Sequence, residues 1–525
     1  MLSGLNVRGS NVSRMKFEAN PKESLSSRTI WYLVAKTAAF ALNFALPLIL
    51  VRRLNQHEFG VYKQVFLVIA TSMSILPMGV AMSAFYFLPR EGIDKGNVVL
   101  NVVLFHVIVG SVVLVVLGLD PGLLQKLFNS PEIVQYGPLI GLAILVWTLS
   151  SFLEVVVVAN QETRLATLFI VGGQFTKTVL LVIAALWFGS IRSLAWAAVI
   201  QGTLQTLVLL AYLWRRFWKG GMRFSSQVLM TQLSYAIPFG AAGLILRVYS
   251  DLHNYFVSYW FGPGLYATYA VGCFNLPLTD ILSDSIGSVT LPRVSYLQHA
   301  GRTREIVELM TRAVRKMAAA CLPLYAFLLI SAKPLIRLLF TDRYLDSWPI
   351  FAVNLTMIPL AIVSTAYDPV IRAYMEHRWF LVRLRALLGA LLIVLLWAGT
   401  TYWGLMGAIL AVVAVSAIER VVVTVKVGQI LAFGRKDLAL LKDLPKLAGA
   451  ALIAAAVALC AEIALGSIAR ACMLSVAGII YGAVYVSALV LLGVPTEREK
   501  RWARQAIGLW QRASGSKSQP ALSEE

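Results

Sequence analysis

Residues 51–62 read VRRLNQHEFGVY, and a degenerate copy of this stretch returns later in the chain. The copy, Val257–Tyr269, ends FGPGLYATY, so that Tyr62 matches Tyr269. Three further matches keep the same order at a nearly constant separation: Leu127-Phe128 with Leu339-Phe340, Glu162 and Arg164 with Glu376 and Arg378, and Gly189 with Gly404. An ordered series of this kind predicts an internal duplication. The alternative is that membrane loops all draw on the same turn residues.

The composition indicates a membrane protein. Of 525 residues, 58% are hydrophobic and 14% are charged, whereas soluble domains average about 25% charged residues. The apolar residues fall in runs of about twenty, which is the length of a membrane-spanning helix. We therefore expect an all-α polytopic membrane protein with about fourteen transmembrane helices.

The net charge of +20 follows the membrane topology. If the N-terminus lies in the cytoplasm, most of the 46 Lys and Arg residues fall in cytoplasmic loops, as the positive-inside rule requires. These residues would contact anionic lipid headgroups, and we do not expect nucleic acid as a partner. The predicted location is the bacterial cytoplasmic (inner) membrane, with both termini in the cytoplasm.

The apolar runs divide the chain into two halves with an even number of spans each. Related by a pseudo-twofold axis along the membrane normal, they would leave a cleft between them. The predicted segments are a cytoplasmic N-terminal segment (1–28), an N-lobe of six helices (29–214), a basic cytoplasmic linker (215–232), a C-lobe of six helices (233–427), a second cytoplasmic linker (428–445), a final helix pair (446–493) and a cytoplasmic tail (494–525).

The loops carry no catalytic machinery that can be identified. None is long enough to form a catalytic domain, and there is no complete P-loop and no zinc-ligand motif. We expect neither a metal nor a cofactor, and we expect a transporter instead of an enzyme. The longest loop contains REIVELMTRAVRK (residues 304–316), whose apolar spacing predicts an amphipathic helix on the inner membrane surface, or else a helix that docks a partner.

Polar residues inside the predicted spans are the candidate binding residues, because each is costly there unless it faces water or a partner. Helical spacing places them on three faces. These are Arg247, Asp251, Asn254 and Ser258 in the seventh helix, Lys36 and Asn43 in the first, and Asn275, Thr279 and Ser283, with Asp280 and Asp284 beside them, in the eighth.

Several of these charges have a structural alternative. Arg247 could pair with Asp251 one turn away, and Lys36 could extend its amine to the cytoplasmic surface. Asp280 and Asp284 could bind a cation or proton, or could balance Arg247 and Lys36. Lys177 has no partner that the sequence reveals. We interpret Glu419-Arg420 and Asp368/Arg372 as local structural pairs.

A basic cavity fits a lipid diphosphate that carries sugars. Its charge and hydroxyl groups cannot cross about 30 Å of hydrocarbon without a hydrated path. Arginine can bind phosphate through two hydrogen bonds.

The motifs and the helix arrangement together resemble polysaccharide-type flippases of the multidrug/oligosaccharidyl-lipid/polysaccharide (MOP) superfamily. The resemblance covers residues 28–493 and rests on Arg53, Gly60 and Tyr62 in the first motif and on Gly262 and Tyr269 in the second. It implies export of a polyprenyl-diphosphate-linked oligosaccharide by alternating access, for extracellular polysaccharide or O-antigen synthesis. It also admits a polysaccharide polymerase or chain-length machinery as a protein partner.

Two departures from the family pattern keep alternatives open. Ala267 stands where the second motif has a glycine matching Gly60. The first helix has Lys36 with no carboxylate partner, unlike the Arg-Asp start typical of lipid II flippases. A lipid II flippase and a cation-coupled multidrug antiporter, the latter using Asp251, Asp280 and Asp284, are the alternative interpretations.

Overall fold

The computed structural model describes residues 37, 41–42, 44–90, 94–218, 221–274, 278–374, 376, 378–464 and 470–495. Within these ranges all regular structure is helical. Nine helical segments among the described residues are long and apolar enough to cross a membrane, by length and composition. The predicted all-α membrane class is therefore confirmed, while the count of fourteen spans stays a prediction.

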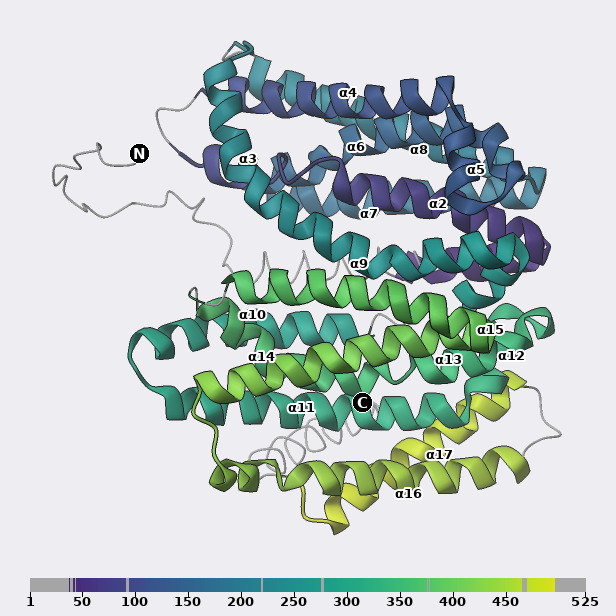
Figure 1. The fold of residues 1–525 in the computed structure, drawn as a ribbon, viewed down its shortest axis with the longest axis vertical. Coiled ribbons are helices and arrows are strands. Elements are labelled where there is room, and N and C mark those ends of the chain that lie inside the picture. The colour runs from purple at the N-terminus through teal and green to yellow at the C-terminus, as the bar shows by residue number, and fades with distance from the viewer. Residues whose placement is uncertain are drawn as a thin grey trace, which may run out of the picture.

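The first half of the chain forms the N-lobe, the upper group of helices in Figure 1. Its elements are α2 (Gln56–Ile75), α3 (Ser83–Phe87), α4 (Lys95–Leu119), α5 (Gly122–Phe128), η1 (Pro131–Tyr136), α6 (Gly137–Ala159), α7 (Thr163–Ile183), η2 (Ala184–Phe188) and α8 (Ile191–Phe217).

The repeated motif itself determines where α2 begins. Asn55 accepts a hydrogen bond from the backbone N–H of Glu58, and the Glu58 carboxylate accepts one from the backbone N–H of Asn55. This reciprocal arrangement, a capping box, satisfies two helix-end donors. The polar residues in VRRLNQHEFGVY thus end one helix and start the next.

The second half begins with one long helix, residues 226–272, which runs beside the N-lobe helices in Figure 1, and continues into the C-lobe and the final helix pair, the lower groups in that view. The elements are α9 (Ser226–Gly272), α10 (Leu278–His299), α11 (Thr303–Ile330), α12 (Ala332–Phe340), η4 (Asp342–Ser347), α13 (Trp348–Asn354), α14 (Met357–Ala373), α15 (Arg378–Ile430), η6 (Arg435–Leu441), α16 (Asp443–Ala464) and α17 (Arg470–Leu491).

Two of these helices contain a sharp change of direction at a glycine. In α9 the break is at Gly262 (φ 70°, ψ 178°), and in α15 it is at Gly404 (φ 56°, ψ −135°). Positive φ values are accessible to glycine without the strain that a Cβ would bring. Each of α9 and α15 therefore consists of two helical segments joined at the glycine.

The segment REIVELMTRAVRK forms the first turns of α11, and the prediction that it lies on the membrane surface is wrong. Ile306, Met310 and Met317 on its apolar face are buried, and α11 packs against α10, α14 and α16. Apolar residues at helical spacing show that one face is covered. They do not distinguish a lipid surface from neighbouring helices.

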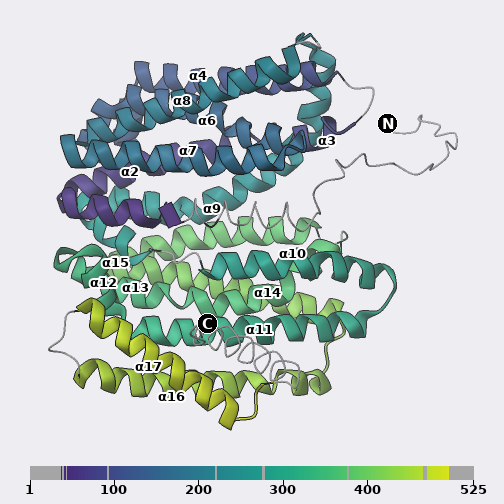
Figure 2. The ribbon, with the colours of Figure 1, turned by 180° about the vertical axis from the view of Figure 1, so that it is seen from behind.

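We call the end of the molecule that holds α5, α12 and the breaks at Gly262 and Gly404 the distal end. The opposite end, with the turns 160–162, 300–302 and 431–434, is the proximal end. Figures 1 and 2 show both ends from opposite sides.

At the distal end, the two copies of the repeated motif contact each other. Gln56 donates hydrogen bonds to the backbone oxygen of Gly264 (3.2 Å) and to the hydroxyl oxygen of Thr268 (2.7 Å). Gly60 lies so close to Pro263 that a Cβ would fall within 3.0 Å of three Pro263 backbone atoms. The motif therefore forms part of the contact between the lobes.

Two arginines extend this contact. Arg52 donates to the backbone oxygen of Leu338 (2.7 Å), and Arg343 donates to that of Leu54 (3.0 Å). Arg53 is the predicted motif residue, but Arg52 makes this contact and Arg53 is exposed. The two arginines are adjacent, and nothing in the motif distinguishes one from the other.

The final helix pair packs on α11, as Figure 2 shows from behind. Small residues, among them Ala450, Ala454 and Ala458, are buried there. Polar contacts fix both ends: Arg315 pairs with Asp443 (2.7 Å), and the Ser331 hydroxyl donates to the buried Glu462 carboxylate.

Candidate functional site

The N-lobe contains a cavity of about 600 Å³ between α2, α6, α7 and α8, with Arg247 of α9 at its edge. Its polar lining consists of Ser74, Ser150, Ser151, Glu154, Gln174, Lys177, Gln201, Gln205 and Arg247. Two cationic groups, one carboxylate and several amides thus surround one space, which we call the N-lobe cavity.

Arg247 is held by a carboxylate and still borders the cavity. Its Nε atom lies 2.6 Å from Oδ2 of Asp251, and the Thr71 hydroxyl on α2 donates to the same oxygen at 2.5 Å. The Asp251 side chain is 11% exposed, and that of Arg247 is 35% exposed. The i,i+4 pair, which the sequence offered as a structural alternative for Arg247, is therefore present, and part of the Arg247 side chain stays exposed beside the cavity.

Lys177 has a partner that the sequence did not reveal. Its Nζ atom lies 4.6 Å from the centre of the Trp147 ring, a distance at which an ammonium is attracted to an aromatic face. The indole N–H of Trp147 donates to the backbone oxygen of Ala198 (2.8 Å), which fixes the ring. A search for opposite charges could not have found this contact.

The amide side chains of α8 were also missed. Gln201 donates to Gln205 one turn later (2.7 Å), and both line the N-lobe cavity with Gln174 of α7. The i,i+4 spacing of two glutamines in an apolar helix was the available signal. The sequence prediction relied on charges and on the polar faces of three other helices.

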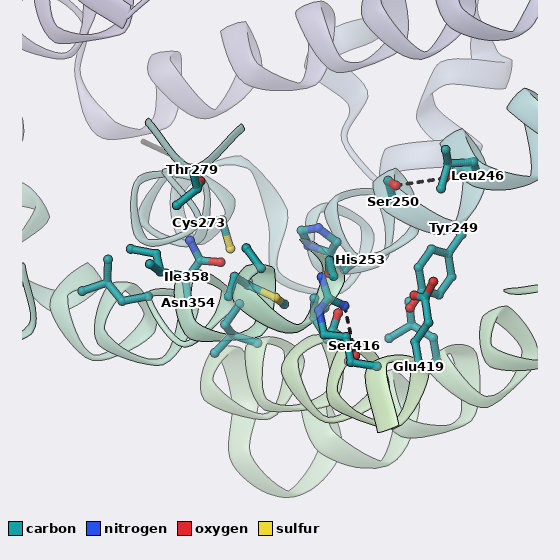
Figure 3. A pocket seen from close by; sticks show the side chains of 18 of the residues that line it. Leu246, Tyr249, Ser250, His253, Cys273, Thr279, Asn354, Ile358, Ser416 and Glu419 are labelled. Atoms are coloured by element: carbon teal, nitrogen blue, oxygen red, sulfur yellow. Dashed lines mark hydrogen bonds between the residues drawn. The ribbon is translucent and has the colours of Figure 1, made fainter. Parts of the chain in front are cut away.

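The C-lobe contains two further cavities, of about 410 Å³ and 460 Å³. Asp368 and Arg420 line both of them, so we treat the two as connected and call them the C-lobe cavities. Figure 3 shows the first, where His253 and Tyr249 of α9 face Ser416 and Glu419 of α15.

Charged groups in the C-lobe cavities are paired across helices. Arg385 Nε lies 2.9 Å from Glu419 Oε1, and this pair joins the two helical segments of α15. Arg420 donates to the backbone oxygens of Leu360 (3.2 Å) and Ser416 (3.0 Å). Glu419 therefore pairs with Arg385, whereas the sequence suggested Arg420.

The remaining predicted residues have different positions. Asn254 is half-buried beside His253 (Nδ2 to Nε2, 3.4 Å) and is not among the residues that line the N-lobe cavity or the C-lobe cavities. Asp284 lines the second C-lobe cavity with Arg372 and Arg420 and is not grouped with Arg247.

Some predicted positions cannot be placed. Lys36, Asn43 and Asn275 lie outside the described residues, and so does the side chain of Asp280. The motif residues Tyr62 and Tyr269 are buried, and Tyr269 contacts His253 through its hydroxyl (2.9 Å to Nδ1). Among the described residues, no three His, Cys, Asp or Glu side chains form a group that could hold a metal ion.

Comparison with known proteins adds two findings. A family model described as "Polysaccharide biosynthesis protein" matches residues 49–349, which is more than half of the chain. A search of curated protein sequences finds no match.

Solved structures with this fold come from the MOP superfamily. The lipid II flippase MurJ, in an inward closed conformation, has a TM-score of 0.72 at 15% identity, covering 88% of this chain and 98% of that one. An inward-facing multidrug resistance MATE family transporter scores 0.60 at 15% identity, covering 79% of this chain and 96% of the other. An MOP superfamily transporter from Pyrococcus furiosus scores 0.55 at 14% identity, covering 77% and 95%. At these identities the likeness establishes the fold.

Proposed function

We propose, from the premise that the chain belongs to the polysaccharide biosynthesis protein family, that it is a flippase for a polyprenyl-diphosphate-linked oligosaccharide. It would move the repeat unit across the cytoplasmic membrane by alternating access, for extracellular polysaccharide or O-antigen synthesis. Its partners would then be this lipid-linked substrate, the surrounding lipids, and a polysaccharide polymerase or chain-length machinery.

The observation that carries the proposal is the pair of cations in the N-lobe cavity. Lys177 and Arg247 border the same space. Lys177 rests on an aromatic ring, and Arg247 is paired with Asp251 while its side chain stays 35% exposed. A diphosphate offers the negative charge that such groups attract. The glutamines and serines around them can donate further hydrogen bonds to the substrate.

The contacts between the lobes at the distal end would close the path to the outside. The segments 215–232 and 428–445, predicted to be cytoplasmic, include the last residues of α8 and of α15, which lie at the proximal end (Figure 1). At the distal end the lobes are joined by hydrogen bonds through Gln56, Arg52 and Arg343. At the proximal end, the start of α9 also contacts the N-lobe, where Gln232 donates to the Ser83 hydroxyl (3.0 Å) and to the backbone oxygen of Val98 (3.2 Å).

A cation-coupled multidrug antiporter is less well supported. Such a site needs a carboxylate available to a cationic ligand. Asp251 is already paired with Arg247 and Thr71, and the carboxylates of the C-lobe cavities lie beside three arginines. If dye efflux depended on Asp251 and no lipid-linked sugar moved, we would conclude that the protein is a multidrug antiporter.

The proposal is tested by flipping in proteoliposomes. Undecaprenyl diphosphate carrying an oligosaccharide is followed by its accessibility to a membrane-impermeant glycosidase, and lipid II serves as a second substrate. We expect rapid movement of the oligosaccharide lipid by the native protein and strong loss in Lys177→Gln and Arg247→Ala. Equal flipping rates in liposomes with and without the native protein would refute the proposal. Faster flipping of lipid II than of the oligosaccharide lipid would show that lipid II is the substrate.

Lys333 offers a matched control for Lys177. Its Nζ atom also lies over a tryptophan ring, 4.4 Å from the centre of Trp348. Lys333 is nevertheless exposed on α12 and lines none of the three cavities. Lys333→Gln removes the same charge and the same type of contact. The flipping rate of Lys333→Gln should therefore equal that of the native protein.

A further inference from the structure

The C-lobe cavities have a composition that the proposed transport of a diphosphate does not use. Three carboxylates (Asp284, Asp368 and Glu419) and three guanidinium groups (Arg372, Arg385 and Arg420) line them. Their formal charges cancel. The site therefore does not select an anion or a cation by net charge, although it is rich in hydrogen-bonding groups.

The paired geometry leaves hydrogen-bonding capacity unused. Arg385 contacts Glu419 through Nε, and Arg420 donates to two backbone oxygens, while a guanidinium carries five N–H donors in a planar fork. Carboxylates likewise accept more than one hydrogen bond. Side chains held in this way present donors and acceptors at fixed positions, which is what a ligand with many hydroxyl groups requires.

The rest of the lining suits the same ligand. Asn354, Ser364 and Ser250 add an amide and two hydroxyl groups, and Tyr249 and His253 add ring faces. Figure 3 shows side chains from α9, α13 and α15 directed toward one space. Sugars bind through both kinds of group, since their hydroxyls form hydrogen bonds and their C–H faces pack on aromatic rings.

Position and size connect these cavities with the N-lobe cavity. Arg247 of α9 borders the N-lobe cavity, whereas its neighbours Leu246, Tyr249 and Ser250 line the first C-lobe cavity. One helix therefore separates the two regions. Volumes of 410 Å³ and 460 Å³ lie within the range of about 300–1,000 Å³ that holds small organic ligands, which is suitable for a short oligosaccharide.

We propose that the C-lobe cavities bind the uncharged sugar units of the lipid-linked substrate, while the N-lobe cavity binds its diphosphate. This inference rests on the proposed function. It assigns recognition of the glycan to a part of the protein distinct from Lys177 and Arg247. Replacements in the C-lobe cavities should then discriminate between substrates with short and long glycans.

The test uses two probes. One is undecaprenyl diphosphate carrying a single N-acetylhexosamine, and the other is the complete lipid-linked repeat unit extracted from cells that make the protein. The variant is Arg385→Gln combined with Glu419→Gln, because removal of only one partner would leave a buried charge unpaired. A second variant, Asn354→Ala, leaves all six charges in place.

We expect both variants to slow flipping of the complete repeat unit by about tenfold, the effect of one or two lost hydrogen bonds, with little change for the single-sugar lipid. Lys177→Gln should slow both probes. Arg337→Gln combined with Asp342→Asn is the matched control, because it removes an exposed arginine–carboxylate pair of similar geometry (3.1 Å) at the distal end. Equal losses on both probes, or no loss on either, would overturn the inference and leave the proposed function intact.

A binding measurement separates the inference from transport. The lipid-free oligosaccharide, released from the repeat unit by mild acid, is titrated into the detergent-solubilised protein. Binding should occur with the native protein and Lys177→Gln and should be lost in the Arg385/Glu419 variant. Absence of flipping by the native protein with retained oligosaccharide binding would refute the proposed function alone. Absence of binding to the native protein would refute the glycan site.

Discussion

The contact between Gly60 and Pro263 allows a sharp prediction for Gly60→Ala. An added Cβ would lie 2.9 Å from the Cα atom of Pro263 and closer still to its carbonyl group. Carbon atoms pack at about 3.5–4.0 Å, so the two backbones must separate by on the order of 1 Å. Both obstructing groups are backbone, and no side-chain rotation can relieve the clash.

The expected cost follows from other overpacked sites. Inserting a methyl group into close packing costs about 1–3 kcal/mol, which shifts an equilibrium by about 5- to 150-fold. Since Gly60 lies in the distal contact between the lobes, this energy should reduce the population that is closed at the distal end. The structure thus predicts a longer mean distance between the lobes at that end.

The distance can be measured by double electron–electron resonance. Spin labels at Lys126 on α5 and Tyr402 near the break in α15 occupy exposed distal positions in the two lobes. The exposed native cysteines, Cys460 and Cys472, are first replaced by serine. Gly60→Ala should broaden the distribution toward longer distances.

Gly264→Ala provides the matched control. Gly264 lies in the same contact, but a Cβ there would meet no atom within 4 Å, and its backbone oxygen still accepts the hydrogen bond from Gln56. Its distance distribution should equal that of the native protein. If Gly60→Ala behaves like Gly264→Ala, the reasoning from the close contact is refuted.

Three further predictions concern stability. A backbone N–H and the Arg304 guanidinium hold the pKa of Asp437 below its ordinary value. The Asp437 carboxylate therefore stabilises the fold above pH ~4 and loses that effect as the pH falls through its lowered pKa. The difference in melting temperature between the native protein and Asp437→Asn should vanish in acid, and a difference that stays constant with pH would contradict this prediction. Ser331→Ala removes the hydroxyl that donates to the buried Glu462 carboxylate and should destabilise the protein by about 1–3 kcal/mol. Thermal unfolding in detergent measures this loss. The control Ser331→Thr keeps a hydroxyl and should retain most of the stability. Gly407→Ala places a Cβ against a facing backbone oxygen in α15 and should cost about 1–3 kcal/mol, whereas an unchanged melting temperature would show that the two segments of α15 separate freely.

The sequence predicted those features that depend on local spacing. Apolar runs predicted the helical membrane fold, and the i,i+4 spacing of Arg247 and Asp251 predicted their ion pair. The comparison of the two halves also drew attention to Gly262 and Gly404, which belong to matched segments and lie at the breaks in α9 and α15.

Contacts between distant segments could not be predicted in this way. Arg385 and Glu419 meet only because α15 reverses at Gly404, so that adjacency in sequence suggested the wrong partner for Glu419. Lys177 is stabilised by the face of Trp147, which carries no formal charge. The position of α11 was misjudged because its apolar face would look the same against lipid as against α14.

The way in which the motif copies meet has an evolutionary consequence. If Tyr62 matches Tyr269, Pro263 matches Gln56 and Ala267 matches Gly60. Gly60 contacts Pro263, and Gln56 contacts Thr268, the neighbour of Ala267. Position 56 of one copy therefore contacts position 60 of the other copy, to within one residue, and the reverse contact is also present. A homodimer has this reciprocal pattern across its twofold axis. A single-lobe ancestor could have assembled through this same self-complementary surface, and fusion of two copies would have allowed the two lobes to diverge.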